Sequence, residues 1–403
     1  MNYNFSKKIS DLKPSAIREI LKVPSTPDTI SFAAGNPAPE SFPVEELSKL
    51  SDEIFKSSPV SALQYSVTDG YAPLREVISD RQKRLFSIGK SVENGDKYND
   101  NTIIVSGGQQ GIELACRVFC NENDTVICEN PTFIGALNAF RSNGAKTVGV
   151  ELLDDGIDID ALERTVKDTP DAKLLYVIPN FQNPAGITTS LEKRKKIYEI
   201  AKKYGLMILE DNPYGELRFS GESIPSIKSF DEDGIVIYCS TFSKILSAGM
   251  RVGFVIAPEE VTSKMVVVKQ TSDVHTNIFF QMLCYKYMTE CDLEGHIKEI
   301  QDIYRHKCAL MLDALDEYMP RSVSYTRPDG GLFIWCTLPG QINAPEYISR
   351  AVQRNVRVVP GATFNCDAEM PSQSFRLNYS TPSDSQIVKG VKILSDLARE
   401  MGL

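Results

Sequence analysis

The chain has few residues of the kinds that hold metal ions. Only three histidines occur among 403 residues, and none of the nine cysteines forms a CxxC pair. Transition-metal sites in proteins are built chiefly from clustered cysteine and histidine, so we expect no metal. Four cysteines lie in apolar helix or strand patterns that are typical of buried, reduced thiols: Cys116, Cys120, Cys128 and Cys239. Reduced thiols favour a cytoplasmic protein.

Long hydrophobic runs and a positive charge excess are also missing. No apolar run approaches the roughly 18–20 residues of a membrane helix, and the N-terminus, MNYNFSKKISDLKPS, lacks the apolar stretch of a signal peptide. The formal net charge is −9, which argues against nucleic acid as a main partner. With 42% apolar and 24% charged residues, the composition is that of an ordinary soluble globular protein. We therefore expect neither a membrane nor a nucleic-acid partner.

Short apolar runs alternate with helical patterns through the middle of the chain. The runs are 102–106 (TIIVS), 125–129 (TVICE), 146–152 (KTVGVEL), 173–179 (KLLYVIP), 206–211 (LMILED), 235–240 (IVIYCS) and 251–257 (RVGFVIA). Several are apolar throughout, as strands are when both faces of a parallel sheet are covered. The sequence thus predicts an α/β fold with a mainly parallel, seven-stranded sheet.

Capping residues and a change of pattern indicate helix and domain boundaries along the chain. Thr189 and Glu192 have capping-box spacing before an apolar stripe, and Gly205 is placed to end that helix. After about residue 290 the pattern changes to long amphipathic helices and short strands. We predict an N-terminal arm at 1–45 that packs with the small domain, a large domain at 46–290 and a C-terminal small α+β domain at 291–403.

Polar residues gather where the predicted strands end. The segments are SGGQQG (106–111), NFQNPAG (180–186), EDNPYG (210–215) and the stretch that holds Lys244 and Arg251. Each segment alone reads equally well as an ordinary turn or a surface loop. Together they bring an amide, a carboxylate, a phenol, a lysine and an arginine to the ligand-binding edge of the sheet. This set suits pyridoxal 5′-phosphate (PLP), which has a phosphate, a phenolic oxygen, a pyridine nitrogen and an aldehyde.

The same segments resemble known motifs. STFSKILSAGMRVG (240–253) is similar to the lysine motif of fold type I PLP-dependent aminotransferases of class I/II, and NPAG, DNPYGEL and FRLNYS resemble three further motifs of that family. The similarity spans nearly the whole chain. Four other segments resemble the kynurenine/2-aminoadipate aminotransferase branch: SAIREIL, ISFAAGNPAPESFP, LQYSVTDGYAPLRE and SGGQQGIELACRVF.

The resemblance implies a role for each matching residue on the cofactor side. Lys244 is expected to bond covalently to the PLP aldehyde and to carry the proton of the reaction. Asp211 is expected to pair with the pyridine nitrogen, and Asn183 and Tyr214 with the phenolic oxygen. Phe133 falls where relatives usually carry a tyrosine that stacks on the ring, so a hydroxyl is lost there. Phosphate contacts are implied for Arg251, Thr241, Ser243, Gly108, Gln109 and, from the partner subunit of a homodimer with composite active sites, Tyr65.

On the substrate side, the resemblance implies that Arg376 holds the α-carboxylate. Gly35 matches a backbone position near the substrate, and Asn183 is also expected to bind the substrate. Arg18 matches an arm residue that meets the substrate side chain in some relatives, but a solvated charge explains it as well.

The implied function is transfer of the α-amino group of an aromatic, hydrophobic or 2-aminoadipate-like amino acid to a 2-oxo acid such as 2-oxoglutarate. A PLP-dependent lyase or decarboxylase on the same fold would use the same cofactor residues. A PLP-binding regulatory or sensor protein is a third possibility. The presence of Lys244, Asp211, Arg251 and Arg376 favours an enzyme, and the branch resemblance favours transamination.

Overall fold

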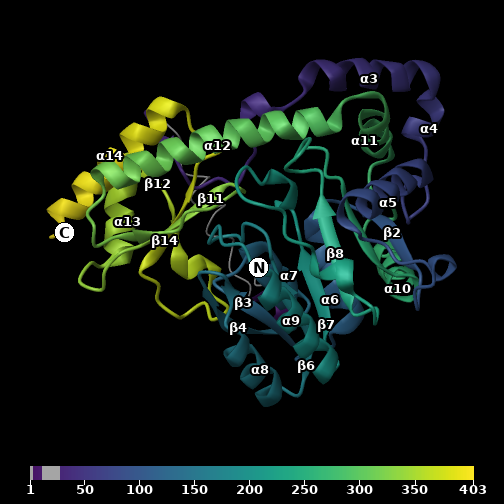
Figure 1. Cartoon of the computed structure of the whole chain (residues 1–403), viewed down its shortest axis with the longest axis horizontal. Coiled ribbons are helices and arrows are strands. Elements are labelled where there is room, and N and C mark those ends of the chain that lie inside the picture. Colours follow the sequence, from purple (N-terminus) through teal and green to yellow (C-terminus); the bar gives the residue numbers. More distant parts are fainter. Residues whose placement is uncertain (1–2, 11–27) are drawn as a thin grey trace.

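A computed structural model describes residues 3–10 and 28–403, and its centre is a sheet in the order β2-β9-β8-β7-β6-β3-β4-β5 (Figure 1). Its strands are β2 (Asp100–Val105), β3 (Thr125–Asn130), β4 (Lys146–Leu153), β5 (Gly156–Ile157), β6 (Ala172–Val177), β7 (Met207–Asp211), β8 (Val236–Thr241) and β9 (Gly253–Pro258). Seven of these eight strands correspond to the predicted apolar runs. The sequence did not indicate β5, a two-residue strand that folds back antiparallel to β4.

The sheet is mainly parallel, as predicted. Strands β4, β3, β6, β7 and β8 pair in parallel, whereas β9 runs antiparallel to both of its neighbours, β8 and β2. The carboxyl ends of the parallel strands therefore meet at one edge, where the loops that follow β6, β7 and β8 come together.

Helices cover both faces of this sheet. One face packs against α6 (Gly108–Phe119), α7 (Ile134–Ser142) and α10 (Glu259–Gln270), and the other against α8 (Ile159–Asp168) and α9 (Leu191–Tyr204). Alternate residues of β6 point to the two faces: Leu174 and Tyr176 join the first core, and Leu175 joins the second. Burial on both sides is the reason that these strands are apolar throughout.

The C-terminal part forms a second, smaller sheet. Its strands lie in the order β10-β11-β14-β13 and pair antiparallel. The elements are α12 (Leu293–Tyr318), β10 (Ser324–Tyr325), β11 (Phe333–Thr337), α13 (Ala344–Gln353), β12 (Val356–Arg357), β13 (Val359–Pro360), η5 (Gly361–Phe364), β14 (Ser374–Asn378) and α14 (Asp384–Glu400). Near the N-terminus, β1 (Ile30–Ser31) pairs in parallel with β12. Helix α12 lies along the molecule and joins the two parts (Figure 1).

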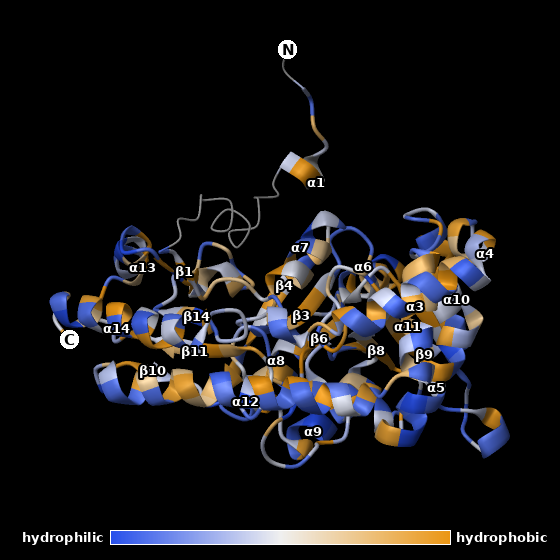
Figure 2. Cartoon of the chain, turned by 90° about the horizontal axis from the view of Figure 1, so that it is seen from above, coloured by the Kyte–Doolittle hydropathy of each residue, from blue (hydrophilic) through white to orange (hydrophobic). Residues whose placement is uncertain are grey.

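The remaining helices lie mostly at the far end of the large sheet. Helices α3 (Val44–Ser57), α4 (Pro59–Leu63) and α5 (Ala72–Phe86) pack around α11 (Ile278–Glu290) (Figure 1). The short elements are α1 (Lys7–Ser10), η1 (Pro39–Ser41), η2 (Val92–Asn94), η3 (Gly215–Leu217) and η4 (Ile227–Phe230). Figure 2 shows the hydrophobic strands of the sheet enclosed by helices of mixed hydropathy. No helix within the described residues has the length and apolar character of a membrane span.

The predicted start of α9 was wrong by one residue. Ser190, not Thr189, is the N-cap, and its hydroxyl accepts a hydrogen bond from the amide of Lys193. The amide of Thr189 instead donates to the carbonyl of Pro179, and its side chain is buried. An N-cap residue has extended backbone and accepts from an amide of the first helical turn, and Ser190 has this geometry, with φ −62° and ψ 154°. Gly205 ends the helix with φ 71°, as predicted.

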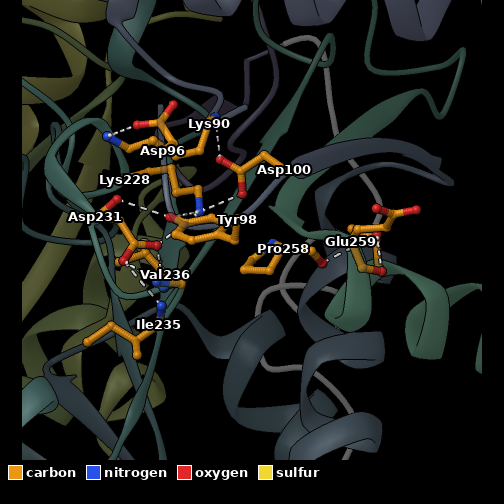
Figure 3. A network of polar contacts seen from close by, with 12 residues as sticks. Lys90, Asp96, Tyr98, Asp100, Lys228, Asp231, Ile235, Val236, Pro258 and Glu259 are labelled. Carbon is orange, nitrogen blue, oxygen red and sulfur yellow. Dashed lines mark hydrogen bonds and ion pairs between the residues drawn. The ribbon is translucent and has the colours of Figure 1, made fainter. Parts of the chain in front are cut away.

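A buried ionic network ties η4 to the beginning of β2. Lys228 is fully buried, and its Nζ lies 2.8 Å from Asp100 Oδ1 and 3.0 Å from Asp231 Oδ2 (Figure 3). The same ammonium lies 5.2 Å from the centre of the Tyr98 ring. Backbone amides of the chain just before β8 donate to the Asp231 carboxylate. Charges taken from water persist only when they are paired in this way.

Candidate active site

The carboxyl edge of the large sheet opens into a cavity of about 460 Å³ that also reaches the smaller sheet. Twelve residues predicted for the site line it: Gly35, Gly108, Gln109, Phe133, Asn183, Asp211, Tyr214, Thr241, Ser243, Lys244, Arg251 and Arg376. They come from at least five separate segments. The first lies beyond β1 and the last lies on β14, so both parts of the molecule build the cavity.

Lys244 lies in the turn that follows β8. Its Nζ donates a hydrogen bond of 2.7 Å to the carbonyl of Gly35. Burial lowers the pKa of Lys244 to about 8, and the nearby positive charges of Arg376 and Arg251 act in the same direction. About a tenth of this amine is therefore neutral at pH 7, far more than for an ordinary lysine, and the neutral amine is the nucleophile.

One end of the cavity is a cradle of hydrogen-bond donors. Helix α6 begins there, and the amides of its first turn lack intrahelical acceptors. The Arg251 guanidinium lies 3.4 Å from Ser243 Oγ and donates to the carbonyl of Ser106 at 3.2 Å. Thr241 Oγ1 lies 2.8 Å from Ser243 Oγ. Helix-start amides, hydroxyls and an arginine are the donor set that binds phosphate.

Gly107 makes this cradle sterically possible. Its φ is 77°, in the left-handed region that side chains rarely adopt. A β-carbon at this position would lie 2.1 Å from Arg251 Nη2. The glycine therefore allows the arginine to pack directly against the beginning of α6.

Asp211 ends β7 and lines the middle of the cavity. Its Oδ2 accepts a hydrogen bond of 2.7 Å from the hydroxyl of Tyr176, which lies on β6. Burial raises the pKa of Asp211 to about 7, although the Tyr176 hydrogen bond lowers it. A buried acid of this kind prefers a cationic partner, such as a protonated ring nitrogen.

Arg376 lies on β14 at the opposite wall, and its side chain is buried. It donates from Nη1 to Asn183 Oδ1 and from Nη2 to the carbonyl of Ala33, both at 2.8 Å. Its Nε is buried without a hydrogen-bond partner. Asn183 in turn donates from Nδ2 to the Tyr214 hydroxyl at 3.4 Å. Burial lowers the pKa of Arg376 to about 10, so the guanidinium stays charged and can receive an anion.

The sequence did not point to Phe333, which lines the cavity, or to Tyr176, which bonds to a residue of its lining. Phe333 packs its ring 4.1 Å from the Arg376 guanidinium carbon and 5.8 Å from the Tyr214 ring centre. Tyr176 bonds to Asp211. The only sign of Tyr176 in the sequence was its hydroxyl among the apolar residues that follow Lys173 in KLLYVIP. The strand register that places this hydroxyl beside Asp211 cannot be derived from the sequence alone.

One described residue that was predicted for the site, Tyr65, does not line this cavity. Tyr65 is 82% exposed, and its ring contacts that of His275 at a centroid distance of 5.9 Å. Arg18 lies outside the described residues.

A nucleophilic lysine, a buried acid, a phosphate cradle and a buried arginine converge at the carboxyl edge of an α/β sheet. They define an enzyme with a phosphorylated aldehyde cofactor and a carboxylate substrate. A family model described as aminotransferase class I and II matches residues 27–394. The chain therefore belongs to the aminotransferase class I and II family.

Similar proteins cover almost the whole chain. Aromatic-amino-acid aminotransferase 1 of Thermococcus litoralis is 39% identical over 400 residues, 98% of this chain and 94% of the relative. The 2-aminoadipate transaminase of Thermus thermophilus is 38% identical over 394 residues, 97% and 95% of the two chains. The kynurenine aminotransferase of Pyrococcus horikoshii, solved in complex with PMP, has a TM-score of 0.93, 37% identity and coverage of 99% and 98%.

The protein is a PLP-dependent aminotransferase, an enzyme that moves amino groups between amino acids and 2-oxo acids. The residues in the cavity fit this cofactor. The cradle around Arg251 suits the phosphate, Asp211 suits the ring nitrogen, and Lys244 suits the aldehyde. The buried Nε of Arg376, which lacks a partner, suits the substrate carboxylate.

Proposed function

We propose that this enzyme takes the amino group of an aromatic, hydrophobic or 2-aminoadipate-like amino acid and passes it to a 2-oxo acid such as 2-oxoglutarate. The observation that carries this proposal is that Lys244 and Arg376 line one cavity together with aromatic side chains. Phe333, which packs beside the Arg376 guanidinium, gives that cavity an apolar wall that suits an aromatic or aliphatic substrate side chain. The names of the relatives support the same range of donors.

The phosphate cradle holds the cofactor in place. Arg251 supplies a charged fork of donors, Thr241 and Ser243 supply hydroxyls, and Gly108 and Gln109 supply backbone amides at the start of α6. The positive end of the helix dipole adds to the attraction for the phosphate. Since phosphate contacts do not change during the reaction, these residues serve binding and orientation.

Bound PLP supplies an aldehyde for the amino group and an electron-accepting ring. Lys244 then acts as acid and base at the substrate α-carbon. Its lowered pKa, about 8, lets the amine take up a proton and release it again near neutral pH. The carbonyl of Gly35, which now accepts from Nζ, lies where the amine is held before reaction.

Four residues of the cavity lining would hold the ring of bound PLP. Asp211 pairs with the ring nitrogen, and its negative charge keeps a proton on that nitrogen. Asn183 and Tyr214, already 3.4 Å apart, donate to the phenolic oxygen. Phe133 contributes a stacking surface without a hydroxyl.

Arg376 holds the α-carboxylate of the substrate. Two parallel hydrogen bonds fix the plane of a carboxylate, so the α-carbon is directed toward Lys244. Asn183 accepts from the same guanidinium and thereby links substrate orientation to ring orientation. Arg18 stays a prediction for contact with the substrate side chain.

The active unit is a homodimer in which Tyr65 of each subunit reaches the partner's phosphate site. The exposure of Tyr65 supports this proposal. The exposure of Val60 and Leu63 on the adjacent helix α4 also supports it, since apolar side chains of this size are usually covered.

The chain divides into an arm at 1–45, a large domain at 46–290 and a small domain at 291–403. All nine cysteines are free, which supports a cytoplasmic enzyme.

A screen of amino donors tests the proposed substrate range. Purified enzyme with PLP is offered a panel of aromatic, aliphatic and acidic amino acids, with 2-oxoglutarate or pyruvate as acceptor, and formation of the new amino acid is measured. We expect the highest kcat/KM with aromatic or 2-aminoadipate-like donors. Exclusive release of ammonia or carbon dioxide would contradict the proposal.

A further inference from the structure

The hydroxyl of Tyr176 is aimed at one oxygen of Asp211. Strands β6 and β7 are neighbours that pair in parallel (Figure 1). In this pairing Tyr176 lies opposite Leu209. Because side chains alternate along a strand, Tyr176, Leu209 and Asp211 share one face of the sheet. The Tyr176 hydroxyl donates to Oδ2 of Asp211 at 2.7 Å.

The second oxygen of Asp211 is left for the cavity. No residue in the described part of the chain forms a hydrogen bond with Oδ1. This oxygen lies 4.0 Å from the place that a β-carbon would occupy at Gly108, the first residue of α6 and part of the cavity wall. The two oxygens therefore have different surroundings: Oδ2 is bonded to Tyr176, and Oδ1 has no such bond among the described residues.

Packing holds the tyrosine in this position. Its side chain is fully buried, and the Phe140 ring meets it edge-on at a centroid distance of 5.5 Å. The titratable groups near Asp211 are Tyr176 on β6, Glu129 on β3, Cys239 on β8 and Tyr214. Burial raises the pKa of Glu129 to about 8, so this carboxyl is mainly neutral at neutral pH and adds little negative charge.

We propose that Tyr176 is a positioning residue that orients Asp211 and keeps its carboxylate ionised, so that the ring nitrogen of bound PLP retains its proton. A hydroxyl that donates to a carboxylate stabilises the ionised form and lowers its affinity for a proton. If Oδ1 pairs with the ring nitrogen of bound PLP, the ionised carboxylate would leave the proton on nitrogen. The inference rests on the proposed role of Asp211.

The test uses the intact enzyme loaded with PLP that is isotopically labelled at the ring nitrogen. Nitrogen NMR reports directly whether this atom carries the proton. In Tyr176→Phe, which removes only the hydroxyl, we expect the signal to move toward that of unprotonated pyridine. We also expect kcat to fall about tenfold, the equivalent of one ordinary hydrogen bond to a charged group, with little change in KM.

Two control variants separate the possible outcomes. Asp211→Asn should move the nitrogen signal further than Tyr176→Phe does. An unchanged signal in Asp211→Asn would contradict the role of Asp211 itself. A shift in that variant with none in Tyr176→Phe would overturn only the inference about the tyrosine.

Tyr238→Phe is the matched control, because Tyr238 is a buried tyrosine on β8 that bonds to Asn212 and not to Asp211. An equal shift in Tyr238→Phe would also overturn the inference.

A second substitution covers the case in which Tyr176→Phe fails to fold or to retain PLP. Tyr176→3-fluorotyrosine keeps the ring and the hydroxyl but makes the phenol a stronger donor. We expect the nitrogen signal to move in the opposite direction, toward the protonated form. An unchanged signal would show that the hydroxyl does not control the proton.

Discussion

The ammonium nitrogen of Lys244 lies 2.7 Å from the carbonyl oxygen of Gly35, a residue 209 positions earlier in the chain. Gly35 follows β1, and β1 pairs with β12 of the C-terminal part. The reactive lysine on the large sheet is therefore held by a segment that is anchored to the other half of the molecule. This contact links assembly of the two parts to the position of the amine.

The pKa of Lys244 predicts how pH affects capture of the cofactor. The neutral amine is the reactive form, and a pKa of about 8 means that its fraction rises as pH increases toward 8 and levels off above it. We expect the rate at which apoenzyme binds PLP to follow this curve, as measured by stopped-flow absorbance. Arg376→Gln removes a neighbouring positive charge and should move the midpoint to higher pH. A midpoint near the ordinary lysine pKa in the unaltered enzyme would contradict the prediction.

Arg376→Lys should impair the reaction without releasing the cofactor. Lysine keeps the charge but loses the planar fork that holds a carboxylate and the hydrogen bond to Asn183. We expect kcat/KM for the amino donor to fall about 10²- to 10³-fold, the effect of losing about 3–4 kcal/mol in a buried charged contact. The affinity for PLP, measured by fluorescence titration, should stay within about threefold. A large loss of PLP affinity would show that the arginine instead supports the cofactor or the fold.

Mixed dimers test whether Tyr65 acts in the partner's site. Lys244→Ala should be inactive, and Tyr65→Ala should bind PLP weakly. If Tyr65 reaches across the dimer, a dimer of one variant subunit of each kind contains one site with both residues intact. We expect mixing of the two variants under subunit exchange to restore activity, up to about half that of the native dimer in each mixed molecule. Absence of complementation in mixed dimers isolated by two affinity tags would refute the cross-subunit role.

The buried network around Lys228 predicts a large effect on stability. Lys228→Met would leave Asp100 and Asp231 close together and without their cation. Removing one partner of a buried ion pair costs about 3–5 kcal/mol, so the thermal midpoint of the apoenzyme should fall by many degrees. Lys203→Met is the matched control, because its side chain is 62% exposed in a surface pair with Glu163. It should change the free energy of unfolding by about 0.5 kcal/mol or less. Equal effects of the two variants in differential scanning calorimetry would contradict this account.

Local patterns in the sequence were sufficient to predict the strands of the sheet and to indicate much of the cavity lining. Apolar runs predicted seven strands because burial on both faces leaves no room for polar residues. Lys244, Asp211 and Asn183 line one cavity because loops that follow parallel strands share one edge. Motif resemblance added Arg376, which no periodicity would have brought near them.

Other features depend on distances between segments that are remote in sequence. Thr189 and Ser190 are both good capping residues, and only the folded structure shows that Ser190 has the capping geometry. Tyr176 is an ordinary strand residue until the register of β6 and β7 sets its hydroxyl beside Asp211. The sequence by itself determined which elements form and which residues can do chemistry, since these follow from local periodicity and residue type. The tertiary structure alone decided which atoms meet, since pairing and register depend on packing of the whole chain.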